Sequence, residues 1–162
     1  MIRASGLALV LVIAAAPLLA CGTSAADPGE PAAASAHLST TAFEDDTALL
    51  TDGTHAIIAA AAAPTYPVEM DALVSGTLTA GPSGCLLSEH DGTQERTAIR
   101  FPYGAVPTEH GVELPDGGFM ALDKPFSVGG GSLQLAEVLP QQLIEECELT
   151  GVHEIFVLNA RQ

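Results

Sequence analysis

The chain has 162 residues, and with 20 acidic residues against 5 Lys and Arg its formal charge is −15. Such a negative surface is repelled by phosphate backbones and anionic lipid headgroups, which excludes nucleic acid as a partner. The acidity is typical of a surface that keeps a protein soluble, and it leaves weak binding of cations or basic partners open.

Residues 1–20 have the parts of a secretory signal. Arg3 supplies a short positive region, an apolar run follows over residues 7–19, and the small residue Ala20 closes the segment. The apolar run is shorter than the roughly 20 residues that cross a bilayer as a helix, so a permanent transmembrane helix is the weaker interpretation. Loss of this leader removes Arg3 and no acid, which changes the formal charge from −15 to −16.

A cysteine stands directly after the leader, in the stretch Leu18-Leu19-Ala20-Cys21. This stretch resembles the lipobox of bacterial lipoproteins, and the Ala-, Gly- and Pro-rich composition around it resembles that of high-GC bacteria such as actinobacteria. The resemblance implies a diacylglycerol on the Cys21 thiol, with palmitate-type chains that hold the protein on the cell membrane outside the cytoplasm. Two or three such chains, at about 0.8 kcal/mol per buried CH₂, anchor a protein permanently. The alternative is ordinary signal cleavage, which would leave Cys21 as a free thiol.

Residues 21–67 are predicted to be the lipidated cysteine and a flexible linker, because their small and polar residues offer little surface to bury. Within this linker, Thr41 and Glu44 have capping-box spacing and predict a short helix over residues 42–50. The alanine run that stops at Pro64 predicts a second helix over residues 54–63. The alternative is a disordered linker without helices that runs as far as Pro67.

Two cysteines remain once Cys21 is assigned to lipid. In an oxidising compartment, Cys85 and Cys147 are expected to form a disulfide. A closed loop of about 60 residues is worth roughly 4 kcal/mol in the chain-entropy model. Two buried thiols or a metal pair are the alternatives, but the chain has no Cys-x-x-Cys and no nearby histidine cluster, so we expect no metal site.

Residues 68–162 are predicted to form a small β-rich domain, because apolar and polar residues alternate with a period of two. Residues 102–115 are predicted to be a loop, and the three glycines 129–131 are expected to mark a bulge or a close approach of two backbones. Strands are predicted over residues 73–79, 85–88, 97–101, 119–122, 126–128, 133–135 and 152–158.

One short helix is expected before the last strand. Pro140 fits its first turn, and Leu139, Leu143 and Cys147 are spaced four apart, so one face carries both leucines and the sulfur. The last strand is apolar on both faces and is therefore expected to be central. The sequence predicts a mainly β fold, a small antiparallel OB-like barrel with one helix held to it by the disulfide.

Arg100 and Tyr103 are the candidate ligand-binding residues. An arginine next to aromatic residues recognises anions and rings well, and Arg100 stands in the stretch Arg100-Phe101-Pro102-Tyr103. His90, between two acids, is interpreted as the solvated end of a hairpin, since adjacent side chains of an extended segment do not converge on one ion.

No catalytic constellation is recognisable, so we expect a non-catalytic module with no cofactor. Its expected partners are membrane lipid through Cys21 and an unknown envelope protein or a small ligand. The alternative is an envelope hydrolase that uses Glu109 and His110 of the 102–118 loop.

Overall fold

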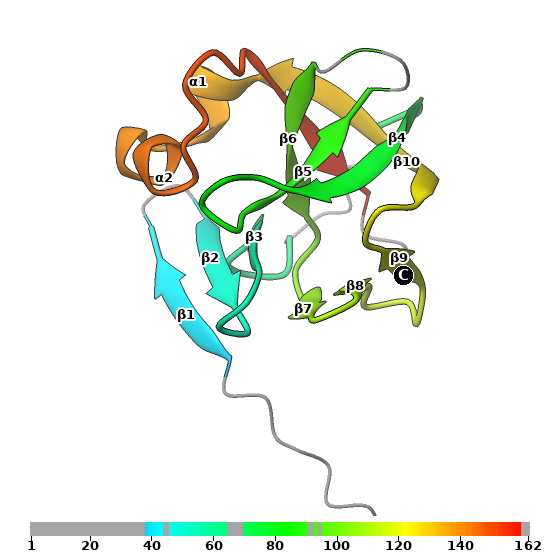
Figure 1. The fold of residues 1–162 in the computed structure, drawn as a ribbon, viewed down its shortest axis with the longest axis horizontal. Helices are drawn as coiled ribbons and strands as arrows, with labels where there is room; N and C mark the ends of the chain where they lie inside the picture. Colours follow the sequence, from blue (N-terminus) through cyan, green and yellow to red (C-terminus); the bar gives the residue numbers. More distant parts are fainter. Residues whose placement is uncertain (1–37, 44–45, 65–69, 91–92, 94, 160–162) are drawn as a thin grey trace, which may run out of the picture. The chain divides into compact units, whose positions relative to one another are not determined.

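Five strands close into a small barrel in the computed structural model of this chain (Figure 1). The strands pair around a ring in the order β4, β5, β6, β11, β10 and back to β4, and only the β6–β11 pair is parallel. The mainly β, OB-like barrel is therefore confirmed, with one parallel pair in a predicted antiparallel ring. The barrel strands are β4 (Ala72–Ala80), β5 (Leu86–Glu89), β6 (Arg96–Phe101), β10 (Pro125–Gln134) and β11 (Glu154–Leu158).

The structure describes residues 38–43, 46–64, 70–90, 93 and 95–159, which belong to one compact unit, Ser35–Gln162. The predicted leader over residues 1–20, the predicted lipid attachment residue Cys21 and the first part of the predicted linker lie outside the described residues. In the described ranges, no helix is long and apolar enough to span a bilayer.

Three further strands extend the sheet from the barrel: β1 (Ser39–Ala42), β2 (Thr47–Thr51) and β3 (Ala56–Ala60). β3 runs parallel to the end of β6, next to the place where β5 pairs with the start of β6. The helices predicted over residues 42–50 and 54–63 are therefore wrong, with residues 44–45 outside the described part. The folded domain also begins near Ser39 and not at residue 68.

Burial on both faces of β3 explains this error. Ile57 and Ile58 point to opposite sides of the strand and both are fully buried, as is Ala59, and Ala56 is 9% exposed. The small alanines let the strand lie between two packed layers, and that packing outweighs the few tenths of a kcal/mol by which alanine favours a helix.

A separate three-stranded sheet forms from β7 (Val106–Thr108), β8 (Gly111–Glu113) and β9 (Phe119–Ala121). The predicted loop over residues 102–115 thus contains a hairpin, whose strands are too short to show a clear alternation. The buried side chains of Val112 and Met120 join this sheet to the interior of the barrel.

β10 runs without interruption through the three glycines 129–131, where a break or bulge was predicted. The predicted close approach of two backbones is present, since a Cβ on Gly130 would collide with the carbonyl oxygen of Val157. The glycines allow a continuous strand to lie tightly against its neighbours.

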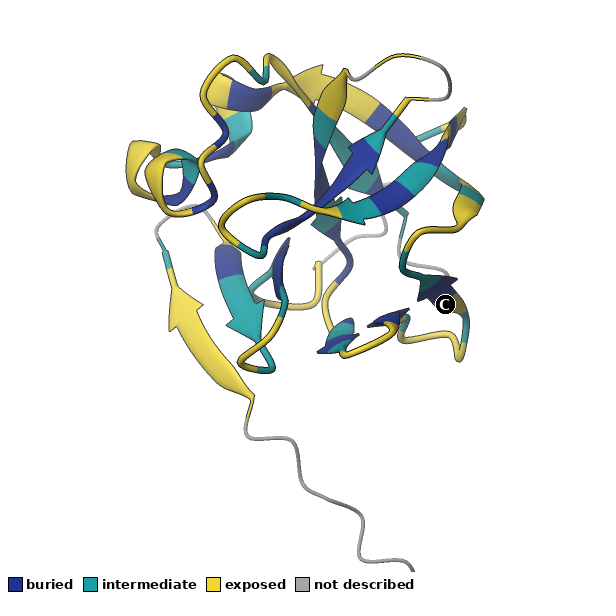
Figure 2. Cartoon of the chain, in the orientation of Figure 1, coloured by how far each residue is buried: buried dark blue, intermediate teal, exposed yellow. Residues whose placement is uncertain are grey.

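The buried residues of these strands, dark blue in Figure 2, belong to two clusters, and adjacent residues along a strand fall into different ones. The barrel core includes Ile57, Leu78, Ile99 and Phe101, together with the buried residues of the small sheet. The helix-side core includes Ile58, Leu87, Leu143, Cys147 and Ile155. The cross-strand pairs Leu87–Ala98 and Ala98–Ile155 show that the helix-side core occupies one face of the barrel strands, because such partners point the same way. The barrel core occupies the inner face, so the helix-side core lies on the outside of the barrel.

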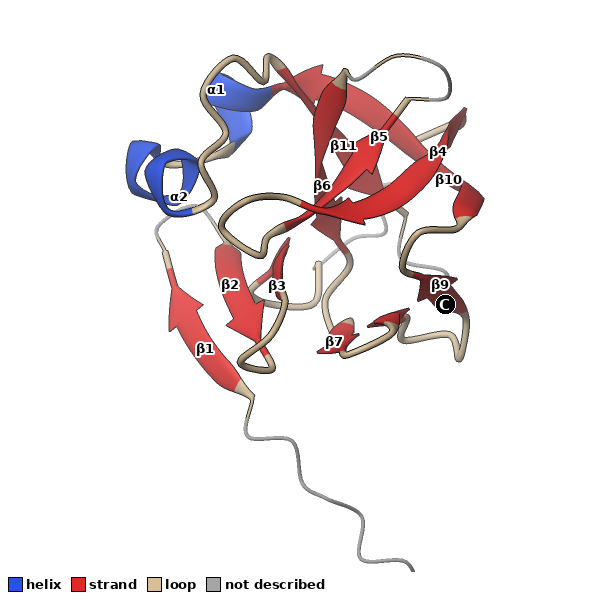
Figure 3. Ribbon diagram, viewed as in Figure 1, coloured by secondary structure: helices blue, strands red, loops and turns tan. Residues whose placement is uncertain are grey.

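Two short helices cover that outer face, α1 (Leu135–Val138) and α2 (Gln141–Glu146), where one was predicted (Figure 3). α2 begins after Pro140 as predicted, and Leu139, Leu143 and Cys147 are all buried in the helix-side core. β11 lies between β6 and β10, so its predicted central position is confirmed.

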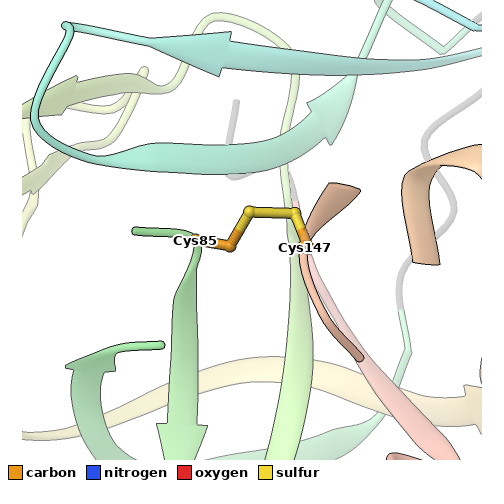
Figure 4. Close-up of a disulfide and its surroundings, with 2 residues drawn as sticks. All are labelled: Cys85 and Cys147. Carbon is orange, nitrogen blue, oxygen red and sulfur yellow. A yellow bond between two sulfur atoms is a disulfide. The ribbon is translucent and has the colours of Figure 1, made fainter. Parts of the chain in front are cut away.

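The predicted disulfide between Cys85 and Cys147 is present and joins the start of β5 to the end of α2 (Figure 4). The two Cα atoms are 5.4 Å apart, and both cysteines are buried in the helix-side core. The covalent bond therefore holds the helices against the barrel, as expected.

Candidate functional site

A cavity of about 480 Å³ brings Arg100 and Tyr103 together on the outer face of the sheet. We call it the Arg100 pocket. Its walls come from β3, β6, β10 and β11 and from the segments that follow β3 and β6. The lining residues are Asp46, Ala60, Ala62, Ala63, Pro64, Met70, Arg100, Phe101, Pro102, Tyr103, Leu133, Val157 and Leu158.

The sheet register places Arg100 in the floor of this pocket. Arg100 pairs with Val157 on one side and with Ile58 on the other, and Val157 pairs with Gly131. These four residues share the outer face, because cross-strand partners point the same way. Ile58 is in the helix-side core, so the pocket lies beside that core.

Hydrogen bonding leaves most of the Arg100 guanidinium unused. Its Nη2 donates to the carbonyl oxygen of Asp46 at 3.0 Å, and its Nε is buried without an acceptor among the described residues. A guanidinium has five N–H donors in a planar fork, and no other one is bonded within the described part of the chain. Arg100 is also free of any ion pair there, although the chain carries 20 acids.

Tyr103 is presented by a tight turn after β6. The N–H of Ala105 donates to the carbonyl oxygen of Pro102 at 3.2 Å, and Gly104 between them has a φ of +86°. A positive φ at the third position is the geometry of a type II turn, which glycine adopts without strain. Phe101 and Pro102 are buried beneath, whereas Tyr103 is 50% exposed at the pocket.

The opposite wall is fixed by Asn159, a residue that the sequence did not single out. Its Oδ1 accepts from the N–H of Met70 at 3.0 Å, and its Nδ2 donates to the carbonyl oxygen of Met70 at 2.9 Å. The Met70 side chain lies over Gly131, where a Cβ would collide with its sulfur. No sequence signal connects these residues, because Met70 and Asn159 are 89 positions apart.

The pocket therefore combines a cation with unused donors and an apolar lining. Leu133 is 37% exposed, and with Tyr103, Met70 and Val157 it offers aliphatic and aromatic surface. This combination suits a ligand with a planar acceptor such as a carboxylate next to an apolar group.

The two residues of the alternative interpretation as a hydrolase lie away from the Arg100 pocket. Glu109 and His110 form the two-residue turn between β7 and β8 and are both exposed. The His110 N–H donates to Oγ1 of Thr108 at 3.4 Å and its carbonyl oxygen accepts from Leu122, but its ring bonds to no acid or serine among the described residues. The only hydroxyl group bonded to this turn among the described residues is that of Thr108, which donates to the carbonyl oxygen of Gly111 at 3.1 Å and not to the His110 ring.

His90 is exposed at the start of a turn, where its backbone bonds to Glu95 and Thr93. The neighbouring Asp91 lies outside the described residues. Within the described ranges, no group of three His, Cys, Asp or Glu could hold a metal ion.

Asp52, between β2 and β3, has a structural role in its turn. Partial burial raises the pKa of its carboxyl group. Two hydrogen bonds to Oδ1, from the N–H groups of His55 and Thr54 at 2.8 Å, and the nearby His55 ring lower this pKa by more than burial raises it. The pKa of Asp52 is therefore lowered, because the charged form is the one these donors favour.

Comparisons of the chain with protein-family models, with curated proteins and with solved structures found no match. The geometry of the described residues is therefore the basis for assigning a function.

Proposed function

We propose that the chain is a lipid-anchored envelope lipoprotein whose barrel domain is a non-catalytic binding module. The Arg100 pocket is its ligand site. The observation that carries the proposal is that Arg100 and Tyr103 line one cavity, in which the guanidinium keeps unused donors beside exposed aromatic and aliphatic side chains.

The chemistry of the pocket indicates the kind of ligand. A carboxylate matches the planar fork of a guanidinium and can accept two hydrogen bonds from it. The surrounding aliphatic side chains favour a branched apolar group next to that carboxylate. A blocked amino acid, or the C-terminal residue of a partner peptide, has both features and fits a cavity of about 480 Å³.

Two methionines make the binding test specific. Met70 lines the Arg100 pocket, whereas Met120 is buried in the barrel core, so methyl signals of 13C-labelled methionine report on the two places separately. We expect N-acetyl-leucine, added to the full-length chain in detergent, to shift the Met70 signal in a saturable way. Its neutral amide, N-acetyl-leucinamide, should bind several times more weakly, since it lacks the carboxylate.

Arg100→Gln should abolish the Met70 shift, and Arg96→Gln is the matched control. Arg96 is exposed and lines a different groove, and its side chain has no hydrogen-bond partner among the described residues. The binding proposal is wrong if N-acetyl-leucine leaves Met70 unshifted, or if Arg100→Gln binds it as well as the wild type does.

The anchor is supported by the leader and the lipobox-like stretch at Cys21. In a bacterial host, the wild-type chain should sediment with membranes and Cys21→Ala should be released from them. The double variant Cys85→Ala with Cys147→Ala is the control that should stay with membranes. Retention of Cys21→Ala on membranes would contradict lipidation at this residue.

The hydrolase alternative has less support, because Glu109 and His110 are exposed on a turn and the His110 ring bonds to no acid or hydroxyl group among the described residues.

A further inference from the structure

A second cavity, of about 360 Å³, opens between the small sheet and the barrel. We call it the two-sheet cleft. One wall comes from β9 and the segment before it, and the other from the first half of β10 and the end of β11. Pro102 and Leu158 border both this cleft and the Arg100 pocket, but the remaining lining residues differ.

The walls of the cleft are rich in rings. Phe119 on β9 is 52% exposed, an unusual position for a phenylalanine in a chain with only 4% aromatic residues. Phe126 on β10 is half-buried and lines the same cleft, with the buried Met120 and Leu158 between the two sheets. Rings on both walls favour an aromatic ligand, since aromatic pairs gain energy beyond their buried area.

Most polar side chains of the cleft are already engaged within the protein. Asp116 Oδ1 accepts from the N–H of Gly118 at 2.9 Å, and the amide of Asn159 is bonded to Met70. The hydroxyl groups of Ser127 and Ser75 bond to each other at 3.0 Å. Lys124 differs from these, because its ammonium has no hydrogen bond or ion pair with any residue that the structure describes.

The backbone of Lys124 is held in place. Its carbonyl oxygen accepts from the N–H of Leu78 at 3.2 Å, and the preceding Asp123 donates its N–H to the carbonyl oxygen of Leu78 at 2.8 Å. Asp123 has a φ of +56°, so the turn is sharply bent where it meets β4. The backbone that carries the Lys124 ammonium is therefore fixed, and Phe119 and Phe126 line the same cleft.

We propose that the two-sheet cleft is a binding site for a small aromatic carboxylate. The ring lies between Phe119 and Phe126, and the carboxylate pairs with the Lys124 ammonium. A volume of about 360 Å³ accommodates one ring with a short acid chain. The positive charge of Lys124 selects an anion, although the chain as a whole is strongly negative. This site does not depend on the Arg100 pocket.

The probe for this site is 3-phenylpropionate, titrated into the full-length chain with 13C-methyl-labelled methionine. Met120 lines the two-sheet cleft and Met70 lines the Arg100 pocket, so the two signals separate the sites. We expect a saturable shift of Met120 with Met70 unmoved. The neutral 3-phenylpropanol lacks the carboxylate and propionate lacks the aromatic ring, so each should bind at least about fivefold more weakly.

Lys124→Gln should weaken binding of 3-phenylpropionate about fivefold while leaving binding of 3-phenylpropanol unchanged. Lys124 is exposed, so its variant should keep the wild-type melting temperature, and Arg96→Gln is the matched control that should bind normally. The proposal is overturned if Met120 does not shift, if Met70 shifts in its place, or if the alcohol binds as tightly as the acid.

Discussion

The barrel core and the helix-side core share the same strands, but different interactions close them. Around the barrel core, each of the five strands is hydrogen-bonded to two neighbours, so the backbone itself encloses the apolar side chains. The helix-side core is covered by α1 and α2, of four and six residues. Helices of this length are unstable in isolation, because a helix nucleus is costly to form.

The disulfide provides stability that such short helices do not have by themselves. Cys85 and Cys147 lie in the helix-side core, and their bond joins a barrel strand to α2. A covalent bond is thus present where backbone pairing does not close the core. The comparison indicates that the two cores should respond differently to the same perturbations.

Removal of the disulfide should have the largest effect. Cys85→Ala with Cys147→Ala should lower the free energy of unfolding by about 4 kcal/mol, because the unfolded chain regains the freedom of the open loop. Urea unfolding of the full-length chain measures this loss. Cys21→Ala is the control that should leave the free energy unchanged, and a loss below about 1 kcal/mol would show that the helices hold without the bond.

The adjacent isoleucines of β3 test whether the two cores are independent. Ile57→Ala and Ile58→Ala each remove a side chain that is fully buried, one from each core, and each should cost about 3 kcal/mol. Combined with loss of the disulfide, Ile57→Ala should be additive, whereas Ile58→Ala should cost less than it does alone. Double-mutant cycles by urea unfolding give both couplings, and equal couplings would contradict independent cores.

Alanine substitutions at two neighbouring glycines of β10 test whether packing is tighter on the inner face of the barrel than on the outer face. A Cβ on Gly130 would meet the backbone oxygen of Val157 and, at 3.2 Å, Cγ2 of Val74, so Gly130→Ala should cost about 2 kcal/mol. A Cβ on Gly129 would approach only the side-chain amide of Asn159, at 3.2 Å, with no contact as short as those at Gly130, so Gly129→Ala should cost less than about 1 kcal/mol. Thermal unfolding ranks the two, and a larger cost at Gly129 would contradict the tighter inner face.

Substitution of Asp52 should have the smallest effect on the free energy of unfolding, and this effect should depend on pH only in the acid range. Its folded-state pKa lies below the ordinary value of 3.8, so its contribution to stability is fully present above that pH and is lost as the pH falls through the folded value. Between about pH 5 and pH 2, Asp52→Asn should therefore lose less unfolding free energy than the wild type. Urea unfolding at a series of pH values measures this difference, and an Asp52→Asn curve parallel to that of the wild type would contradict the role of the two hydrogen bonds.

Much of the fold could be predicted because its signals are local. Alternation marked β4 and β6, Pro140 marked the start of α2, and the even pair Cys85 and Cys147 predicted the disulfide. The apolar character of residues 152–158 on both faces predicted a central strand, as β11 is. Each of these signals lies within a few residues or in the cysteine count.

The misassigned segment and most of the site depend on contacts between distant residues. Ala56–Ala60 has the composition of a helix, and only its position beside β6, between two cores, makes it a strand. Arg100 and Tyr103 are near each other in the sequence, but Leu133 and Val157 join them only through strand pairing. The two-sheet cleft likewise exists only where β9 meets β10.

The sequence by itself thus determined the strands with clear alternation, the start of the helix, the disulfide and the chemistry expected of Arg100. The tertiary structure decided which alanine-rich segment became a strand, which face each core occupies and which side chains surround each cation. The physical reason is that periodicity and turn chemistry act between near neighbours, whereas burial and pocket shape arise from pairing across long separations.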